Sequence, residues 1–407
     1  MGMDASEIFI GLVIAAAAVA VLSRWLRVQY TLALLLFGLL LGNLGFAPQV
    51  PLTSDLILLI FLPPLLFEAA FALDLGLLWS RRRGVLALAL IGTLLATLVG
   101  GAIVYWATPL PWTVALVFGA MIAATDPVAV LATFRGLGAD KRLSVLLEGE
   151  SLFNDGIALS LFLTLVAAVG GGFRLGDAAA TFGLSMIGGV VLGLVIGWVG
   201  HLAIALVDEP LSEMVVSVAV AYGAFLAGER LHLSGVIATL IAAMTLSRLG
   251  RTRGWVFSGG SPEAIDNLWS FLAFIANTAL FLLLGLNAPS AGLTTYPYFV
   301  AWGIAAALLG RAATAYGLGA VLHRRALRLP WAERHVVFWG GLRGAVALAA
   351  ALSLPPDFPY RQQLLAMTYG VVLFTVLAQG LTIGPLVRRL GLLREQGAPP
   401  VAPIAEG

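Results

Sequence analysis

Residues 148–162 read Glu-Gly-Glu-Ser-Leu-Phe-Asn-Asp-Gly-Ile-Ala-Leu-Ser-Leu-Phe, and they place three carboxylates, on Glu148, Glu150 and Asp155, where a long apolar stretch begins. A charged side chain costs about 2.5–3.5 kcal/mol at the centre of a membrane helix on insertion scales, so such charges are rare and commonly mark ion paths or proton relays. Asp155 is therefore the first candidate for the group that carries the chemistry.

The composition of the whole chain indicates a membrane protein. The 407 residues are 60% hydrophobic and 11% charged, and the mean hydropathy is +0.99, which does not fit a soluble globule of this length. A helix needs roughly 20 apolar residues to cross a bilayer. Stretches near this length lie at about 7–23, 30–46, 55–73, 84–107, 112–134, 146–170, 178–206, 212–229, 231–249, 265–287, 296–322, 333–354 and 361–387. We predict an all-α polytopic membrane protein with about 13 transmembrane helices.

The basic residues test this count independently, because cytoplasmic loops of membrane proteins hold most of the Lys and Arg. With the N-terminus outside, the predicted cytoplasmic segments hold 18 of the 23 basic residues. Dropping one span would destroy this asymmetry, so we predict a multi-pass protein of the cytoplasmic membrane with its C-terminus in the cytoplasm. The formal net charge of +2 reflects these loops and does not indicate a nucleic-acid partner.

Several classes of chemistry lack their sequence signatures. The chain has no cysteine, so it has no disulfide, no thiol catalysis and no Cys-ligated metal. The Gly-rich motifs of nucleotide binding and the usual hydrolase and metalloprotease motifs are missing. Residues 396–407 are rich in Pro and Ala and are predicted to be disordered. Residues 1–395 are predicted to form a single transmembrane domain.

A proline interrupts the fifth span beside an acidic residue, in the segment Ala-Ala-Thr-Asp-Pro-Val at 123–128. Pro127 cannot donate to the carbonyl four residues back, and it disfavours helical geometry at Asp126. We predict a broken helix, whose freed carbonyls and Thr125 hydroxyl line a cavity and coordinate a desolvated cation, as in transporters with discontinuous helices. The alternative is a simple proline kink with Asp126 as a capping residue.

The twelfth span carries Arg343 within Gly-Gly-Leu-Arg-Gly at 340–344, about ten residues from either end. An arginine at this depth needs a buried anion, and the glycines allow unwinding or close helix approach. The fifth and twelfth spans are seven spans apart and so run in opposite directions, as inverted repeats require. We predict two inverted six-helix repeats, at about 7–170 and 212–390, joined by a linker helix at about 178–206.

Further polar residues gather in the sixth and third spans. Helical spacing places Ser151 near Asn154 and Asp155, because residues three and four apart share one face of a helix. Glu68 follows the pair Pro63-Pro64 in the third span and is a further acid at membrane depth. The alternative for Glu68 is a carboxylate at a frayed helix end.

These segments together resemble the sodium/proton exchanger family, specifically its prokaryotic NhaP-type branch of monovalent cation:proton antiporters. The blocks that carry the resemblance, in family order, are Ala124-Thr125-Asp126-Pro127, Glu150-Ser151 through Asn154-Asp155, Leu233-Ser234-Gly235-Val236-Ile237-Ala238, Asn277-Thr278-Ala279-Leu280-Phe281 and Gly341-Leu342-Arg343-Gly344-Ala345. The resemblance spans nearly the whole transmembrane region. It implies thirteen helices in two inverted repeats, two unwound helices that cross near the site, and a homodimer.

The resemblance also implies which residues form the site. The Na⁺ ligands would be Glu68, Thr125, Ser151 and Asp155, supported by Asp126 and Asn154, with Glu150 and Arg343 as a structural ion pair. The electrogenic branch is expected to carry two adjacent aspartates where this chain has Asn154-Asp155. Arg343 also leaves no intramembrane lysine able to release a proton. Both differences favour electroneutral exchange of one cation for one proton.

The function expected from these residues is secondary transport across the lipid bilayer, which would maintain sodium and pH homeostasis. A bare carboxylate is costly in a low dielectric, so Asp155 must hold either a proton or a cation before the site can move between the two faces. Such a carrier needs no cofactor, nucleotide or ATP. The alternatives are a K⁺/H⁺ antiporter of the same fold, a cation channel, and an intramembrane enzyme that uses the acids as an acid/base pair.

Overall fold

The computed structural model describes residues 11, 14, 17–23, 25, 29–44, 52–137, 140–171, 175–207, 209–253, 262–318, 320–321 and 329–392. All regular structure in these residues is helical. Within them, seven helices are long and apolar enough to cross a membrane. These are Leu75–Ala107, Lys141–Val169, Gly176–Ile204, Pro210–Arg230, Ala264–Ala291, Pro297–Leu318 and Arg361–Arg389. The structure thus confirms an all-α polytopic membrane protein.

The helices follow the predicted spans in chain order from the second span onward. The first part of the chain forms α2 (Tyr30–Asn43), η1 (Leu56–Phe61), α3 (Leu62–Ala72), α4 (Leu75–Leu86), η2 (Ala87–Gly92), α5 (Thr93–Ala107), α6 (Trp112–Met121), α7 (Val128–Leu137), α8 (Lys141–Gly171) and α9 (Leu175–Ile204). The second part forms α10 (Pro210–Arg230), α11 (Gly235–Arg253), α12 (Pro262–Asn287), η3 (Ala288–Ala291), α13 (Pro297–Ala312), η4 (Ala313–Leu318), α15 (Trp331–Trp339), α16 (Ala345–Leu352), α17 (Arg361–Phe374), η5 (Thr375–Gln379) and α18 (Gly380–Arg389). Residues 7–10, 12, 13, 15 and 16 of the predicted first span and the whole predicted tail at 396–407 lie outside the described residues.

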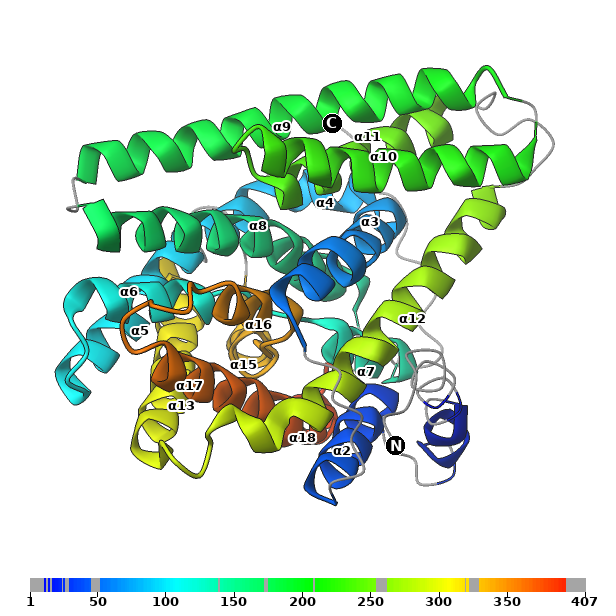
Figure 1. Cartoon of the computed structure of the whole chain (residues 1–407). Coiled ribbons are helices and arrows are strands. Elements are labelled where there is room, and N and C mark those ends of the chain that lie inside the picture. The colour runs from blue at the N-terminus through cyan, green and yellow to red at the C-terminus, as the bar shows by residue number, and fades with distance from the viewer. Residues whose placement is uncertain are drawn as a thin grey trace, which may run out of the picture.

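The helices form two groups that α12 connects. The helices α9, α10 and α11, green in Figure 1, pack against one another on one side, and α12 runs from this side to α2. Glycines allow the closest approaches between helices. A Cβ built on Gly193 would lie 2.5 Å from the carbonyl oxygen of Ala238, and one on Gly38 would lie 2.3 Å from that of Leu282. The second group contains α5, α6, α13 and α15 to α18, with α8 between the two groups.

Two helices are interrupted within the second group, as the sequence predicts. The chain leaves helical geometry between α6 and α7 at 122–127, and again between α15 and α16 at 340–344. The two breaks meet, because the backbone N–H of Asp126 donates to the carbonyl of Leu342 at 2.8 Å. The Asp126-Pro127 segment is therefore a true interruption and not a simple kink.

Candidate functional site

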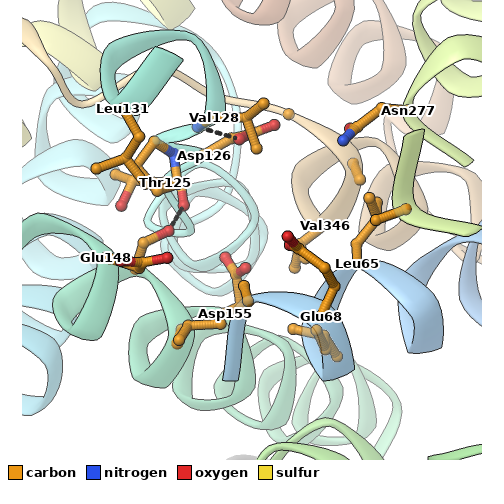
Figure 2. Close-up of a pocket in the computed structure, with 18 of the residues that line it drawn as sticks. Leu65, Glu68, Thr125, Asp126, Val128, Leu131, Glu148, Asp155, Asn277 and Val346 are labelled. Atoms are coloured by element: carbon orange, nitrogen blue, oxygen red, sulfur yellow. Dashed lines mark hydrogen bonds between the residues drawn. The ribbon is translucent and has the colours of Figure 1, made fainter. Parts of the chain in front are cut away.

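A cavity of about 320 Å³ lies beside the two helix breaks. Its walls come from α3, from α7 and the break before it, from α8, α12 and α16. Four acidic residues line it, namely Glu68, Asp126, Glu148 and Asp155. In Figure 2 the carboxylates of Asp155 and Glu68 point into the same space, below Thr125 and Asp126. The structure thus brings acids from three separate predicted spans to one site.

Helix α8 supplies one wall through residues on a single face. Glu148, Ser151 and Asp155 are spaced by three and four residues, so they lie above one another on the helix, and all three line the cavity. Asp155 is half-buried. Its negative charge is repelled by Asp126 and attracted by Arg343. This balance is what a site needs if it is to hold either a proton or a small cation.

The side chains of α8 also hold the unwound segment at Thr125. Asn154 Nδ2 donates to Thr125 Oγ1 at 2.6 Å, and the Thr125 backbone N–H donates to Asn154 Oδ1 at 3.2 Å. The Ser151 hydroxyl donates to the Thr125 carbonyl. Asn154 is 2% exposed and does not line the cavity. It supports the site by fixing Thr125.

Asp126 combines a cavity-lining position with a structural one. Its Oδ1 accepts from the backbone N–H of Val128 at 3.0 Å, an Asx-turn that fixes the chain where α7 begins. Its backbone N–H binds the second broken helix, as described above. Asp126 thus joins the two breaks and adds negative charge beside Asp155.

Glu68 lies inside α3, four residues before that helix ends at Ala72. The alternative of a frayed helix end is therefore wrong. The pair Pro63-Pro64 stands at the start of α3, where the π-helical turn η1 gives way to α-helix. The helix is continuous from Leu56 to Ala72, so the two prolines lack N–H groups that a regular helix would use, and the π-helical turn before them adjusts the chain to that loss. Glu68 consequently faces the cavity from a regular helix.

The structure overturns the predicted ion pair between Glu150 and Arg343. Glu150 instead pairs with Arg311 of α13, whose two terminal nitrogens donate to its two carboxylate oxygens. Both residues are buried, at 1% and 5% exposed. Arg311 Nε also donates to the Val337 carbonyl at 2.9 Å. The Arg311 side chain fits in this position because residue 341 is glycine: a Cβ there would lie 2.5 Å from Arg311 Nε.

Arg343 binds the other broken helix instead of a carboxylate. It is 2% exposed, and its Nη1 donates to the carbonyl of Ala124 at 3.2 Å and lies 3.5 Å from that of Ala123. These carbonyls have lost their helical partners through the break, so the guanidinium takes the place of missing N–H donors. Arg343 therefore joins the two unwound segments at their crossing.

Sequence reasoning missed several residues of the site. It gave no role to Arg311, Ser270 or Asn277, although the last two line the cavity, and it counted Glu148 only among the carboxylates at the start of the sixth span. Asn277 stood in a recognised block, and Arg311 stood within a predicted span, so both carried a signal. What was missing was the packing of α12 and α13 against the breaks.

The absence of a side chain at Gly344 is necessary at the crossing. A Cβ there would lie 2.2 Å from Asp126 Oδ2 and 2.8 Å from Asp126 Cβ. We expect Gly344→Ala to lower both the melting temperature in detergent and the transport rate, because Asp126 must move. Gly223→Ala is the matched control, since nothing lies within 4 Å of a Cβ at that position. Equal melting temperatures and rates for the two variants would contradict this account of the crossing.

The donors at this site are oxygens. Carboxylates, hydroxyls and backbone carbonyls suit hard cations with little affinity for nitrogen or sulfur ligands. In the described part of the chain, no group of three His, Cys, Asp or Glu residues is placed to hold a metal ion. The arrangement fits a small cation that is bound and released, with carboxylates that can also take up protons.

Comparison with known proteins gives a consistent family. The model of the family described as sodium/hydrogen exchanger, transmembrane, matches residues 12–389. The Na⁺/H⁺ antiporter NhaH of Halobacillus aidingensis is 34% identical over 401 residues, which cover 95% of this chain and 98% of that protein. The Na⁺/H⁺ antiporter NhaP of Pseudomonas aeruginosa is 36% identical over 352 residues, which cover 83% and 81%.

A solved structure shares the fold. The sodium proton antiporter MjNhaP1 from Methanocaldococcus jannaschii superimposes with a TM-score of 0.74 at 21% identity, covering 95% of this chain and 98% of that one. The broken helices and the acidic cavity thus occur in a chain whose sequence and fold both match antiporters. The protein belongs to the transmembrane sodium/hydrogen exchanger family, in its NhaP-type branch.

Proposed function

We propose that this protein exchanges Na⁺ for H⁺ across the cytoplasmic membrane by alternating access, with the two ions competing for Asp155. The observation that carries the proposal is the meeting of Asp155, Glu68, Ser151 and Thr125 at one cavity beside two helix breaks. The printed names of the relatives, which are Na⁺/H⁺ antiporters, support the choice of ions.

In the proposed cycle, Asp155 is the group that exchanges its occupant. An unpaired carboxylate inside a low-dielectric protein is costly, so the site crosses only when Asp155 holds a proton or a cation. Na⁺ would be bound by Asp155, Glu68, the Ser151 hydroxyl and Thr125, while Asn154 and Asp126 keep the unwound segment in position. Each ion gradient then drives the other, so no cofactor or nucleotide is required.

The Glu150–Arg311 pair stays out of the exchange in this proposal. A guanidinium does not release its proton at accessible pH, and the partner carboxylate is occupied by two hydrogen bonds from it. Arg343 is likewise a fixed charge. With Asp155 as the group that changes its occupant, one cation replaces one proton in each cycle.

We expect membrane potential to have no effect on transport, because one positive charge replaces another at Asp155. A potassium diffusion potential set with valinomycin should leave the rate of Na⁺ uptake into proteoliposomes unchanged when no pH gradient is imposed. Faster uptake, or a sustained current on a solid-supported membrane, would show that the exchange moves net charge.

The experiment that tests the function is a pH-gradient dye assay in proteoliposomes, titrated separately with Na⁺, Li⁺ and K⁺. Proton movement on addition of Na⁺ supports Na⁺/H⁺ exchange, whereas a response to K⁺ alone supports a K⁺/H⁺ antiporter. A cation channel would conduct without moving protons against their gradient.

We also propose the homodimer, the two inverted repeats and the outside position of the N-terminus. Helix α9 offers a surface for a second copy, because only 11% of its apolar span is buried within the chain. Cross-linking in membranes tests the dimer, and labelling of introduced cysteines from each side tests the orientation. The cysteine-free chain makes single cysteines clean reporters.

A further inference from the structure

One basic residue stands among the acids of the cavity. Arg135 of α7 lines it together with Leu131, one helical turn earlier. The side chain of Arg135 is exposed, so it lies where the cavity meets the solvent. Among the residues that the structure describes, no carboxylate oxygen lies within 4.0 Å of its guanidinium. Arg135 is therefore a charge at the cavity mouth that forms no ion pair with the described part of the chain.

Two carboxylates share this end of the cavity with Arg135. The positive charge of Arg135 acts on both Glu68 and Glu148, and Glu68 in turn acts on Glu148. Glu148 is half-buried and lies seven residues before Asp155, two turns away on the same face of α8. A cation that enters from this end passes the Arg135 and Glu148 side chains before it reaches Asp155.

We propose that Arg135 and Glu148 set the affinity of the site for cations arriving from this side, with Arg135 as a tethered competitor of the transported ion and Glu148 as its attractor. This inference rests on the proposed cation exchange and adds two specificity-determining residues to it. A cavity whose walls are mostly low-dielectric concentrates the field of its charges, so one charge at its mouth changes the local concentration of cations.

The two charges act in opposite directions on the KM for Na⁺. Neutralising Arg135 removes repulsion, so we expect Arg135→Gln to lower the KM about fivefold with kcat unchanged, which corresponds to about 1 kcal/mol. Neutralising Glu148 removes attraction, so Glu148→Gln should raise the KM by a similar factor. The double variant should return close to the wild-type KM. Arg135→Lys keeps the charge and should behave as wild type.

The measurement is the Na⁺ dependence of proton movement in everted membrane vesicles, which expose the predicted cytoplasmic ends of α7 and α8. It is made at the alkaline limit, where protons no longer compete. Arg142→Gln is the matched control, because Arg142 is exposed at the start of α8 and does not line the cavity. Added choline chloride should shrink the difference between wild type and Arg135→Gln, since salt screens exposed charges.

The outcomes separate this inference from the function on which it rests. Wild-type vesicles that move no protons on addition of Na⁺ would overturn both. Active wild-type vesicles with an unchanged KM in Arg135→Gln, or with the same shift in Arg142→Gln, would overturn the inference alone. A KM that shifts in the same direction in Arg135→Gln and Glu148→Gln would also overturn the inference. Opposite charges must shift the KM in opposite directions, whereas a loss of packing can shift it in the same direction in both variants.

Discussion

Asp155→Asn should reduce both Na⁺-driven proton movement and proton-driven Na⁺ uptake to the rate of empty vesicles. The substitution keeps the volume of the side chain and removes its exchangeable negative charge. An amide neither takes up a proton near neutral pH nor balances the charge of Na⁺. Asp155 lines the cavity on the same face of α8 as Ser151, and the other acid on that face, Glu148, lies two turns away.

The protein should stay folded when Asp155 is replaced, since its carboxylate accepts no hydrogen bond from the described residues. Size-exclusion profiles and melting temperatures in detergent check this. Asp357→Asn is the matched control, because Asp357 is exposed in the loop before α17 and does not line the cavity. Substantial exchange by a monodisperse Asp155→Asn protein would refute the proposed mechanism.

The broken helices could be predicted because their causes are local. Pro127 lacks the N–H that a continuous helix requires, and its ring disfavours helical geometry at the preceding residue. Three glycines around Arg343 allow unwinding in the same way. The depth of Asp155 in the membrane stays a prediction, made from the apolar run on its C-terminal side.

The partner of Glu150 could not be predicted because it depends on packing. The sequence contains two arginines within predicted spans, Arg311 and Arg343, and either supplies a positive charge at membrane depth. The choice follows from the crossing of the breaks, where Gly341 leaves room for Arg311 and the free carbonyl of Ala124 takes Arg343. The positions of charged residues in the sequence reveal neither the contact at Gly341 nor the free carbonyl of Ala124.

Glu150→Gln and Arg311→Met should each strongly destabilise the protein, by about 3–5 kcal/mol, because each leaves the other member as an uncompensated buried charge. Both side chains are almost fully buried, at 1% and 5% exposed, and the pair is bidentate. The double variant replaces the ion pair with neutral side chains of similar size, so it should lose much less than the sum of the single variants. Apparent melting temperature and yield in detergent are the readouts.

A second cycle serves as the control and decides between the two possible partners. Glu150→Gln combined with Arg343→Met should show a smaller coupling energy. Arg343 binds backbone carbonyls, and its interaction with Glu150 is electrostatic attraction without a hydrogen bond. Coupling energies isolate a pairwise interaction as long as the single substitutions create no new contacts. A larger coupling with Arg343 than with Arg311 would restore the pair expected from the sequence. Additive losses in both cycles would mean that Glu150 is stabilised by neither arginine, and that the site is held together by the hydrogen bonds at Thr125 and the crossing of the breaks alone.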